Sequence, residues 1–199
     1  MALFNRMIRP LAAALFGFLL LAGCVPTAEN PITSKKGAGD QSLIGAWKGT
    51  SNDNTPIWLH FLRGKDNEIG AVLMPRGTGD KAPDEWSAFR VVTAEIKGTH
   101  YMSALWDYND GKPTEGRDKG YHLLRYAIAS DGTLSLWLVD EEKLIAAVES
   151  GKLEGKIEGE GGSKEVRVTA SSEKLGKFLA KSNPAELFDK PFVKATLAN

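Results

Sequence analysis

The hydrophobic and polar positions of this chain alternate most clearly between residues 120 and 140. Tyr121–Ile128 is rich in aromatic and branched side chains, and Leu134–Val139 alternates apolar residues with small or aromatic ones. Ser130–Thr133 lies between them and contains Asp-Gly, a dipeptide typical of tight hairpin turns. This stretch therefore predicts a β-hairpin at the centre of a sheet.

Segments with strand character recur on both sides of this hairpin. Five of them precede it and two follow it, which with the hairpin makes about nine predicted strands. They are Leu43–Ser51, Ile57–Leu62, Glu68–Met74, Trp86–Lys97, Tyr101–Tyr108, Leu153–Glu158 and Glu165–Ala170. Because most of the links between them are short, neighbouring strands should pair antiparallel.

Two later segments change to helical spacing, and each follows a residue that commonly caps a helix. Glu141–Ser150 follows Asp140, and Ser172–Lys181 follows Ser171. A third and shorter helical turn should begin at Asn183. The tail from Asp189 to Asn199 carries Phe192 and Val193, and we expect them to dock on the domain only weakly.

The predicted fold is a mostly β domain over residues 43–199. It combines about eight or nine antiparallel strands with two or three short helices. Alternation is blurred on several strands, which indicates that both faces of the sheet meet apolar surface. A closed or nearly closed barrel with a covering helix has this pattern, and it leaves few free sheet edges.

The first 23 residues have the layout of an export signal. Arg6 and Arg9 precede a continuous apolar run, Leu11–Ala22, which is shorter than the roughly 20 residues that a membrane-spanning helix needs. The run ends in Leu21-Ala22-Gly23-Cys24, which resembles the lipobox of bacterial lipoproteins. The resemblance implies that Cys24 becomes the mature N-terminus and carries lipid, such as palmitate, on its sulfur and its amine.

Cys24 is the single cysteine of the chain, so no intrachain disulfide can form. The alternative is an ordinary signal peptide with an incidental cysteine, but a lone thiol in an exported protein needs an explanation. Residues 24–42 are rich in Pro, Gly, Ser, Thr and charged residues. They predict a flexible tether with a reach of roughly 20–25 Å.

Charge argues against a nucleic-acid partner. The chain has 25 basic and 25 acidic residues; the mature part keeps 23 basic and all 25 acidic ones, a net charge of −2 with histidine neutral. A nucleic-acid-binding domain usually carries a basic excess, which is absent from this composition. The hydrophobic fraction of 42% is ordinary for a folded globular domain.

The first predicted strand contains Gly45-Ala46-Trp47, which resembles the Gly-x-Trp opening of lipocalin-type barrels. The resemblance implies that this strand closes the barrel floor. It also implies that Trp47 packs under a basic residue from a late strand, for which Arg167 is the candidate. The helix Glu141–Ser150 between late strands departs from the lipocalin pattern, and a generic small barrel with Trp47 as a core residue fits equally well.

Aromatic residues on the predicted strands are candidates for a ligand-facing wall or for the core. A barrel of about eight strands can enclose one small ligand or be filled entirely by side chains. The candidates are Trp47, Trp58, Trp86, Tyr101, Trp106, Tyr121, Tyr126 and Trp137.

Motifs for catalysis or metal binding are weak, so we expect no enzymatic activity, metal or cofactor. The three histidines lack paired spacing, and three acidic residues near one loop do not follow a calcium-loop pattern. These residues are His60, His100 and His122, and Asp107, Asp110 and Asp118. Ser171 and Lys174 fit Ser-x-x-Lys by letters, but Ser171 is interpreted as a helix cap.

Two functions fit these patterns. The first is a lipid-anchored protein of the cell envelope that holds a small apolar ligand inside its β-domain. The second is an accessory or scaffold protein that recruits envelope proteins through the outside of that domain. Val25, rather than an aspartate, follows Cys24, and by analogy with enterobacterial lipoproteins this favours the outer membrane, with the domain facing the periplasm.

Overall fold

A computed structural model of the protein describes most of the chain after residue 24. The predicted signal segment, residues 1–23, and the predicted lipidation residue, Cys24, lie outside the described residues. The described ranges are 25–35, 39–75, 86–115, 120–159 and 164–198.

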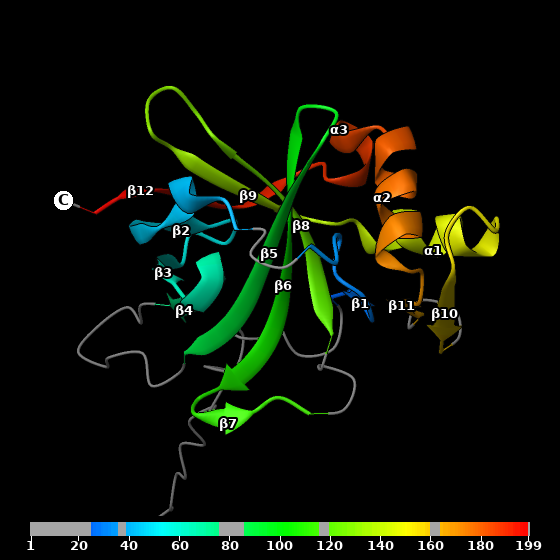
Figure 1. The fold of residues 1–199 in the computed structure, drawn as a ribbon, viewed down its shortest axis with the longest axis horizontal. Coiled ribbons are helices and arrows are strands. Elements are labelled where there is room, and N and C mark those ends of the chain that lie inside the picture. The colour runs from blue at the N-terminus through cyan, green and yellow to red at the C-terminus, as the bar shows by residue number, and fades with distance from the viewer. Residues whose placement is uncertain (1–24, 36–38, 76–85, 116–119, 160–163, 199) are drawn as a thin grey trace, which may run out of the picture.

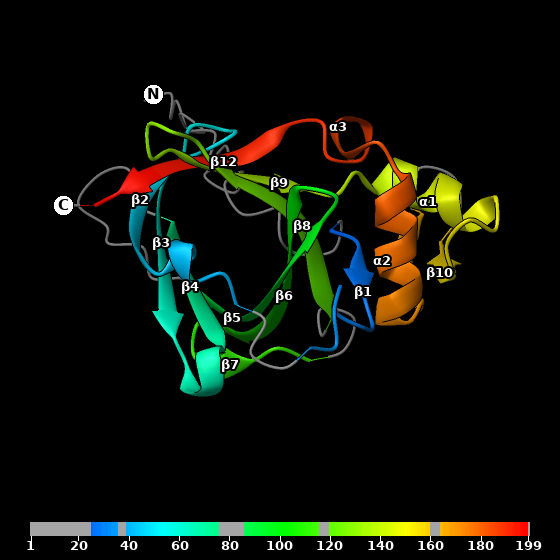
Figure 2. The ribbon, with the colours of Figure 1, turned by 45° about the horizontal axis from the view of Figure 1, so that its top comes forward.

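The centre of the fold is a closed, eight-stranded antiparallel β-barrel (Figures 1 and 2). The last strand of the ring pairs back onto the first, with Met102 opposite Leu124. The predicted mostly β, lipocalin-like barrel is thereby confirmed. In hydrogen-bonded order, the strands are β8 (Tyr121–Ile128), β9 (Leu134–Leu138), β12 (Pro191–Leu197), β2 (Gly45–Ser51), β3 (Pro56–Arg63), β4 (Ile69–Pro75), β5 (Ser87–Ile96) and β6 (Thr99–Asn109).

A small outer sheet continues from the barrel along β8. β9 pairs with the second half of β8, from Leu124 onward, and leaves the first half free on that side. There β8 pairs with β1 (Thr27–Ala28), so that Thr27 lies opposite His122. The outer sheet then runs through β11 (Glu165–Val168) to β10 (Gly155–Glu158). β7 (Lys112–Pro113) pairs separately with the end of β6.

Helices gather beside this outer sheet, on one side of the barrel (Figure 2). They are α1 (Glu141–Glu149), α2 (Ser172–Lys181) and α3 (Pro184–Leu187). The predicted caps are confirmed, because Asp140 accepts a hydrogen bond from the Lys143 amide and Ser171 accepts one from the Lys174 amide. Within the described part of the chain, no helix is long and apolar enough to cross a membrane.

The C-terminal tail corrects one prediction. The expectation of weak docking is wrong, because β12 lies between β9 and β2 and completes the barrel ring. Val193 and Ala195 point into the barrel and are buried. The sequence signal was weak because these inward side chains are small and both partner strands are distant along the chain.

The first described segment corrects a second prediction. The tether expected over residues 24–42 is instead attached to the domain at Val25–Lys35, with Ala28 and Ile32 buried. The Ile32 amide donates to Ser103 Oγ at 2.9 Å, and the Asn30 side chain donates to the carbonyl of Ala170 at 3.1 Å. The segment is attached through only two strand residues and a few single contacts, so its sequence shows almost no periodic pattern.

Two separate hydrophobic cores result. The first fills the barrel and includes Trp47, Phe61, Val91, Met102, Leu124, Tyr126 and Leu136. The second lies between the barrel wall, the outer sheet and the helices, and it includes Tyr101, Leu123, Leu144, Val168, Leu175, Leu179 and Phe188.

Candidate functional site

One end of the barrel is closed by a short 3-10 helix, η1 (Gln41–Leu43). Leu43 is fully buried there, and Trp47 is 1% exposed. The Trp47 indole Nε1 donates to the carbonyl oxygen of Leu43 at 2.7 Å, which ties η1 to β2. This end of the barrel is therefore a packed floor.

A hydrogen-bonded pair, Asp40 and Tyr126, connects the floor to β8. The Tyr126 hydroxyl donates to Asp40 Oδ2 at 2.8 Å, and burial together with this carboxylate raises the pKa of Tyr126. Burial pushes the pKa of Asp40 upward, but hydrogen bonds from Ser42 and Tyr126 outweigh it and leave that pKa below its ordinary value. Asp40 therefore stays ionised and holds η1 against β8.

The structure places Arg167 away from Trp47. Arg167 lies on β11 in the outer sheet, where its Nε is 3.3 Å from Glu29 Oε1. Trp47 lies on β2, three strands around the ring from β8. The basic partner that the lipocalin resemblance suggested for Trp47 is therefore not Arg167.

A cavity of about 70 Å³ lies inside the barrel toward the end opposite η1. Its lining is apolar except for one histidine side chain, and its exposed surface is entirely apolar. The lining residues are Leu59, Phe61, Ala71, Leu73, Phe89, Val91, Met102, Ala104, His122, Leu124, Leu136, Leu138 and Phe192. Typical ligand pockets have about 300–1,000 Å³, so this cavity accepts only a small apolar group.

An aromatic cluster borders the cavity. Phe89 stacks on Trp106 with 6.0 Å between ring centroids, and His122 meets Phe89 edge-on at 6.5 Å. His122 is 5% exposed and also contacts Trp106, at 6.1 Å. Sequence reasoning weighed His122 only as a metal ligand, although its position two residues before Leu124 on β8 places it on the inward face.

The eight aromatic candidates are distributed over both cores and the surface. Trp47, Trp106 and Tyr126 face the barrel interior, and none of the eight lines the cavity among the described residues. Four of the remaining five lie on outer faces of strands, and Trp86 immediately precedes β5. Tyr101, Tyr121 and Trp137 belong to the outer core, Trp58 stacks on His60, and Trp86 is 37% exposed.

The histidines and acidic residues considered for metal binding are dispersed. His100 contacts Tyr126 near the floor, His60 is on the outer face, and His122 is inside the barrel. Among the described residues, no group of three or more His, Cys, Asp or Glu side chains could hold a metal ion. Asp107 instead binds Arg90 at 2.6 and 2.9 Å, and Asp118 lies outside the described residues.

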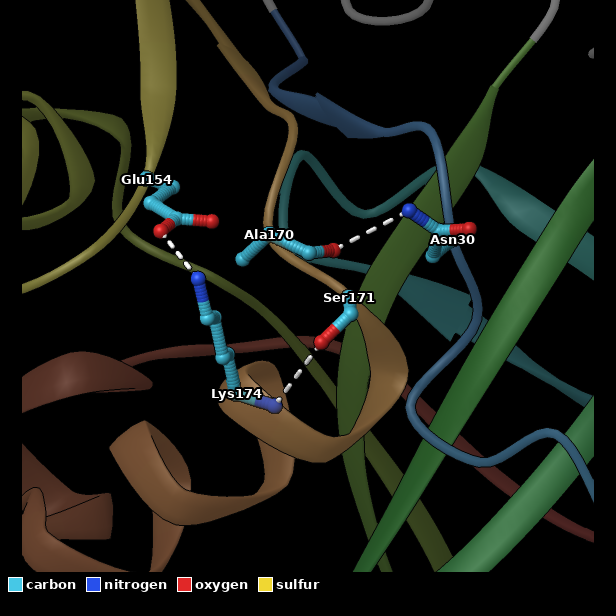
Figure 3. Close-up of polar contacts among 5 residues, drawn as sticks. All are labelled: Asn30, Glu154, Ala170, Ser171 and Lys174. Carbon is cyan, nitrogen blue, oxygen red and sulfur yellow. Dashed lines mark hydrogen bonds and ion pairs between the residues drawn. The ribbon is translucent and has the colours of Figure 1, made fainter.

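A larger hollow, the helix groove, lies outside the barrel between α1 and α2. Its volume is about 770 Å³. Figure 3 shows the start of α2 beside it: the Ser171 hydroxyl accepts from the Lys174 amide, and the Lys174 ammonium pairs with Glu154. Ser171 and Lys174 thus serve as cap and ion-pair partner.

Comparisons with protein-family models, curated proteins and solved structures found no match to this chain. The lipobox and Gly-x-Trp resemblances therefore stay predictions. Function has to be inferred from the barrel cavity and the helix groove that the described residues form.

Proposed function

We propose that this protein is a lipid-anchored protein of the bacterial cell envelope whose barrel binds the apolar end of a small ligand. The cavity of about 70 Å³ carries this proposal, because its exposed surface is entirely apolar and it lies in a closed barrel. Narrow ligands with a single alkyl chain match its shape and polarity. The proposed role is binding rather than catalysis.

The size of the cavity limits how much affinity it supplies. A water molecule takes about 30 Å³ of liquid, so the cavity has room for about two or three methylene-sized groups. Each buried methylene contributes about 0.8 kcal/mol, which gives about 2 kcal/mol in total. That corresponds to a roughly 30-fold gain in affinity, so the cavity selects the end of a chain rather than holding a whole lipid.

The proposed anchor is the lipid on Cys24, which would place the protein on the outer membrane facing the periplasm. Thr27 of β1 follows three residues after Cys24. Three extended residues span about 10 Å, so the lipid would hold the domain close to the bilayer. Replacing Cys24 with Ser should move the protein from the membrane pellet to the soluble fraction and abolish palmitate labelling. If Cys24→Ser sedimented with membranes as the unsubstituted protein does, and the unsubstituted protein took up no palmitate, the anchor would be refuted.

Ligand binding can be tested at Met102, which lines the cavity. The full-length protein, labelled with ¹³C on its methionine methyl groups and held in lipid nanodiscs, is titrated with decanoate. We expect the Met102 methyl signal to shift and saturate. Met74 on β4 lies opposite Trp58 on the outer face, so its signal is the internal control.

A matched pair of variants separates the cavity from the surface. Ala104→Leu fills the cavity and should abolish the shift at Met102, whereas Ala127→Leu, at an exposed position on the same barrel, should preserve it. If Met102 does not respond to decanoate, or responds equally in Ala104→Leu, the barrel does not bind alkyl chains.

A further inference from the structure

The helix groove combines an apolar floor with a basic rim. Leu153, Leu187 and Ala147 are buried at its base, and Phe178 of α2 is partly exposed beside them. Its volume of about 770 Å³ is within the range of about 300–1,000 Å³ for ligand-binding hollows. In size and lining it differs from the cavity in the barrel.

Positive charge is concentrated at this groove. Five lysines and two glutamates line it, a local net charge of +3, whereas the mature chain has a net charge of −2. The lysines come from α1, from the segment after α1 and from α2. They are Lys143, Lys152, Lys174, Lys177 and Lys181.

Most of this charge is available to a partner. Lys143, Lys152 and Lys181 form no ion pair with any residue that the structure describes. Lys174 pairs with Glu154 and Lys177 with Glu173, but the side chains of all four are more than half exposed. Exposed pairs of this kind contribute little to stability, so carboxylates of a partner can replace them at little cost.

The arrangement of the lysines indicates an elongated partner. Lys174, Lys177 and Lys181 recur at helical spacing and follow one face of α2 over about 10 Å. Among the described residues that line the groove, none is an arginine, the side chain best suited to bidentate phosphate recognition. A row of carboxylates therefore matches the groove better than one phosphate group, and a flat bilayer would not reach its floor.

We propose that the helix groove binds an acidic amphipathic helix of a partner protein. The apolar face of that helix contacts Phe178, Leu153 and Leu187, and its flanking carboxylates face the lysines of both walls. Grooves between helices commonly receive amphipathic helices in this way, and complementary charge fixes their orientation. α1 and α2 have nine and ten residues, which matches a partner helix of about three turns.

The test uses the full-length protein in nanodiscs of phosphatidylcholine. The probe is a fluorescein-labelled 15-residue peptide with leucine at helical i, i+3, i+4, i+7 spacing and glutamate on both flanks. We expect saturable binding by fluorescence anisotropy. Lys152→Glu with Lys181→Glu should weaken binding about tenfold, which is about 1.4 kcal/mol, because each substitution turns an attraction into a repulsion.

The matched control is Lys65→Glu with Lys194→Glu, which makes the same change in net charge at exposed positions on η2 (Lys65–Asn67) and β12. It should weaken binding less than twofold. Equal weakening by both double variants would show a long-range charge effect and overturn the groove as the site.

Two further probes decide the class of partner. A peptide of the same composition with scrambled leucine positions should bind at least about tenfold more weakly if the apolar face enters the groove. Equal binding of the scrambled peptide would overturn the helix as occupant. If phosphatidylglycerol vesicles bind through Lys152 and Lys181 and the amphipathic peptide does not bind, the groove recognises a lipid surface and the proposed protein partner is wrong.

Discussion

Closure of the barrel depends on a close approach of two backbones at Gly49. Gly49 on β2 lies opposite Ala195 on β12. A Cβ atom added at Gly49 would lie 2.0 Å from the carbonyl oxygen of Lys194 and 2.6 Å from Cα of Ala195. Because both contacts are with backbone atoms, no side-chain rotation can relieve them. Gly49→Ala should therefore push β12 away from β2.

The cost follows from the displacement required. Cβ contacts below 3.0 Å are essentially never seen, so the strands must separate by about 1 Å at this point. That stretches N–H···O bonds of about 2.9 Å toward 3.9 Å, beyond the hydrogen-bonding range. Losing one or two such bonds and straining the packed interior should cost about 2–4 kcal/mol, against about 0.5–1 kcal/mol gained from stiffening the unfolded chain. The net loss of stability is therefore about 1–3 kcal/mol.

Urea denaturation followed by circular dichroism measures this loss. Gly70→Ala on β4 is the matched control, because the nearest atom to its added Cβ is 4.0 Å away. It should leave the free energy of unfolding unchanged or raise it by up to about 1 kcal/mol, because the gain from stiffening the unfolded chain is not offset by a clash. If Gly49→Ala unfolded at the same urea concentration as Gly70→Ala, β12 would not pack against β2 as described.

Three further changes test the floor, a helix cap and the tail. Tyr126→Phe should cost about 1 kcal/mol at neutral pH, a value discounted because Asp40 is only partly buried. Because the pKa of Asp40 is lowered in the folded protein, its carboxylate stabilises the fold above the unfolded pKa near 3.9. This stabilisation is lost as pH falls through the lower folded pKa. Between pH 5 and 2, Tyr126→Phe should therefore lose less stability than the unsubstituted protein in acid titrations followed by fluorescence. Asp140→Ala removes the cap of α1 and should cost about 0.5–2 kcal/mol in urea, whereas equal stability would show that the cap bond contributes nothing. Truncation after Lys190 removes β12 and should abolish cooperative thermal unfolding, a result that a weakly docked tail would not give.

Local rules predicted the elements whose signals lie close together in the sequence. Both longer helices begin after the capping residues that the sequence indicated, Asp140 and Ser171. Strand alternation also located the barrel wall, because residues two apart share a face wherever one side of a strand is buried. These features depend on contacts within a few residues and therefore leave a periodic record.

The cavity and the helix groove could not be predicted from such a periodic pattern. The cavity is bounded mainly by aliphatic and phenylalanine side chains from seven strands, together with Met102 and His122, whereas the predicted wall of Trp and Tyr residues lies largely elsewhere. The helix groove lies between α1 and α2, which the outer strands β10 and β11 separate in the sequence. The common face of its lysines appears only after the two helices pack together, so their spacing along the sequence does not indicate it.

The segment Val25–Ile32 links the proposed anchor to the helix groove. β1 pairs with β8 where β9 has ended, and it also pairs with β11, the strand that leads into α2. Asn30 binds the carbonyl of Ala170, immediately before the cap of α2 (Figure 3). If Cys24 carries the lipid, these contacts hold the bilayer near the start of α2. The lysines of the groove then lie within reach of helices that belong to other membrane-anchored proteins, and a partner at the same surface would meet this site without leaving the membrane.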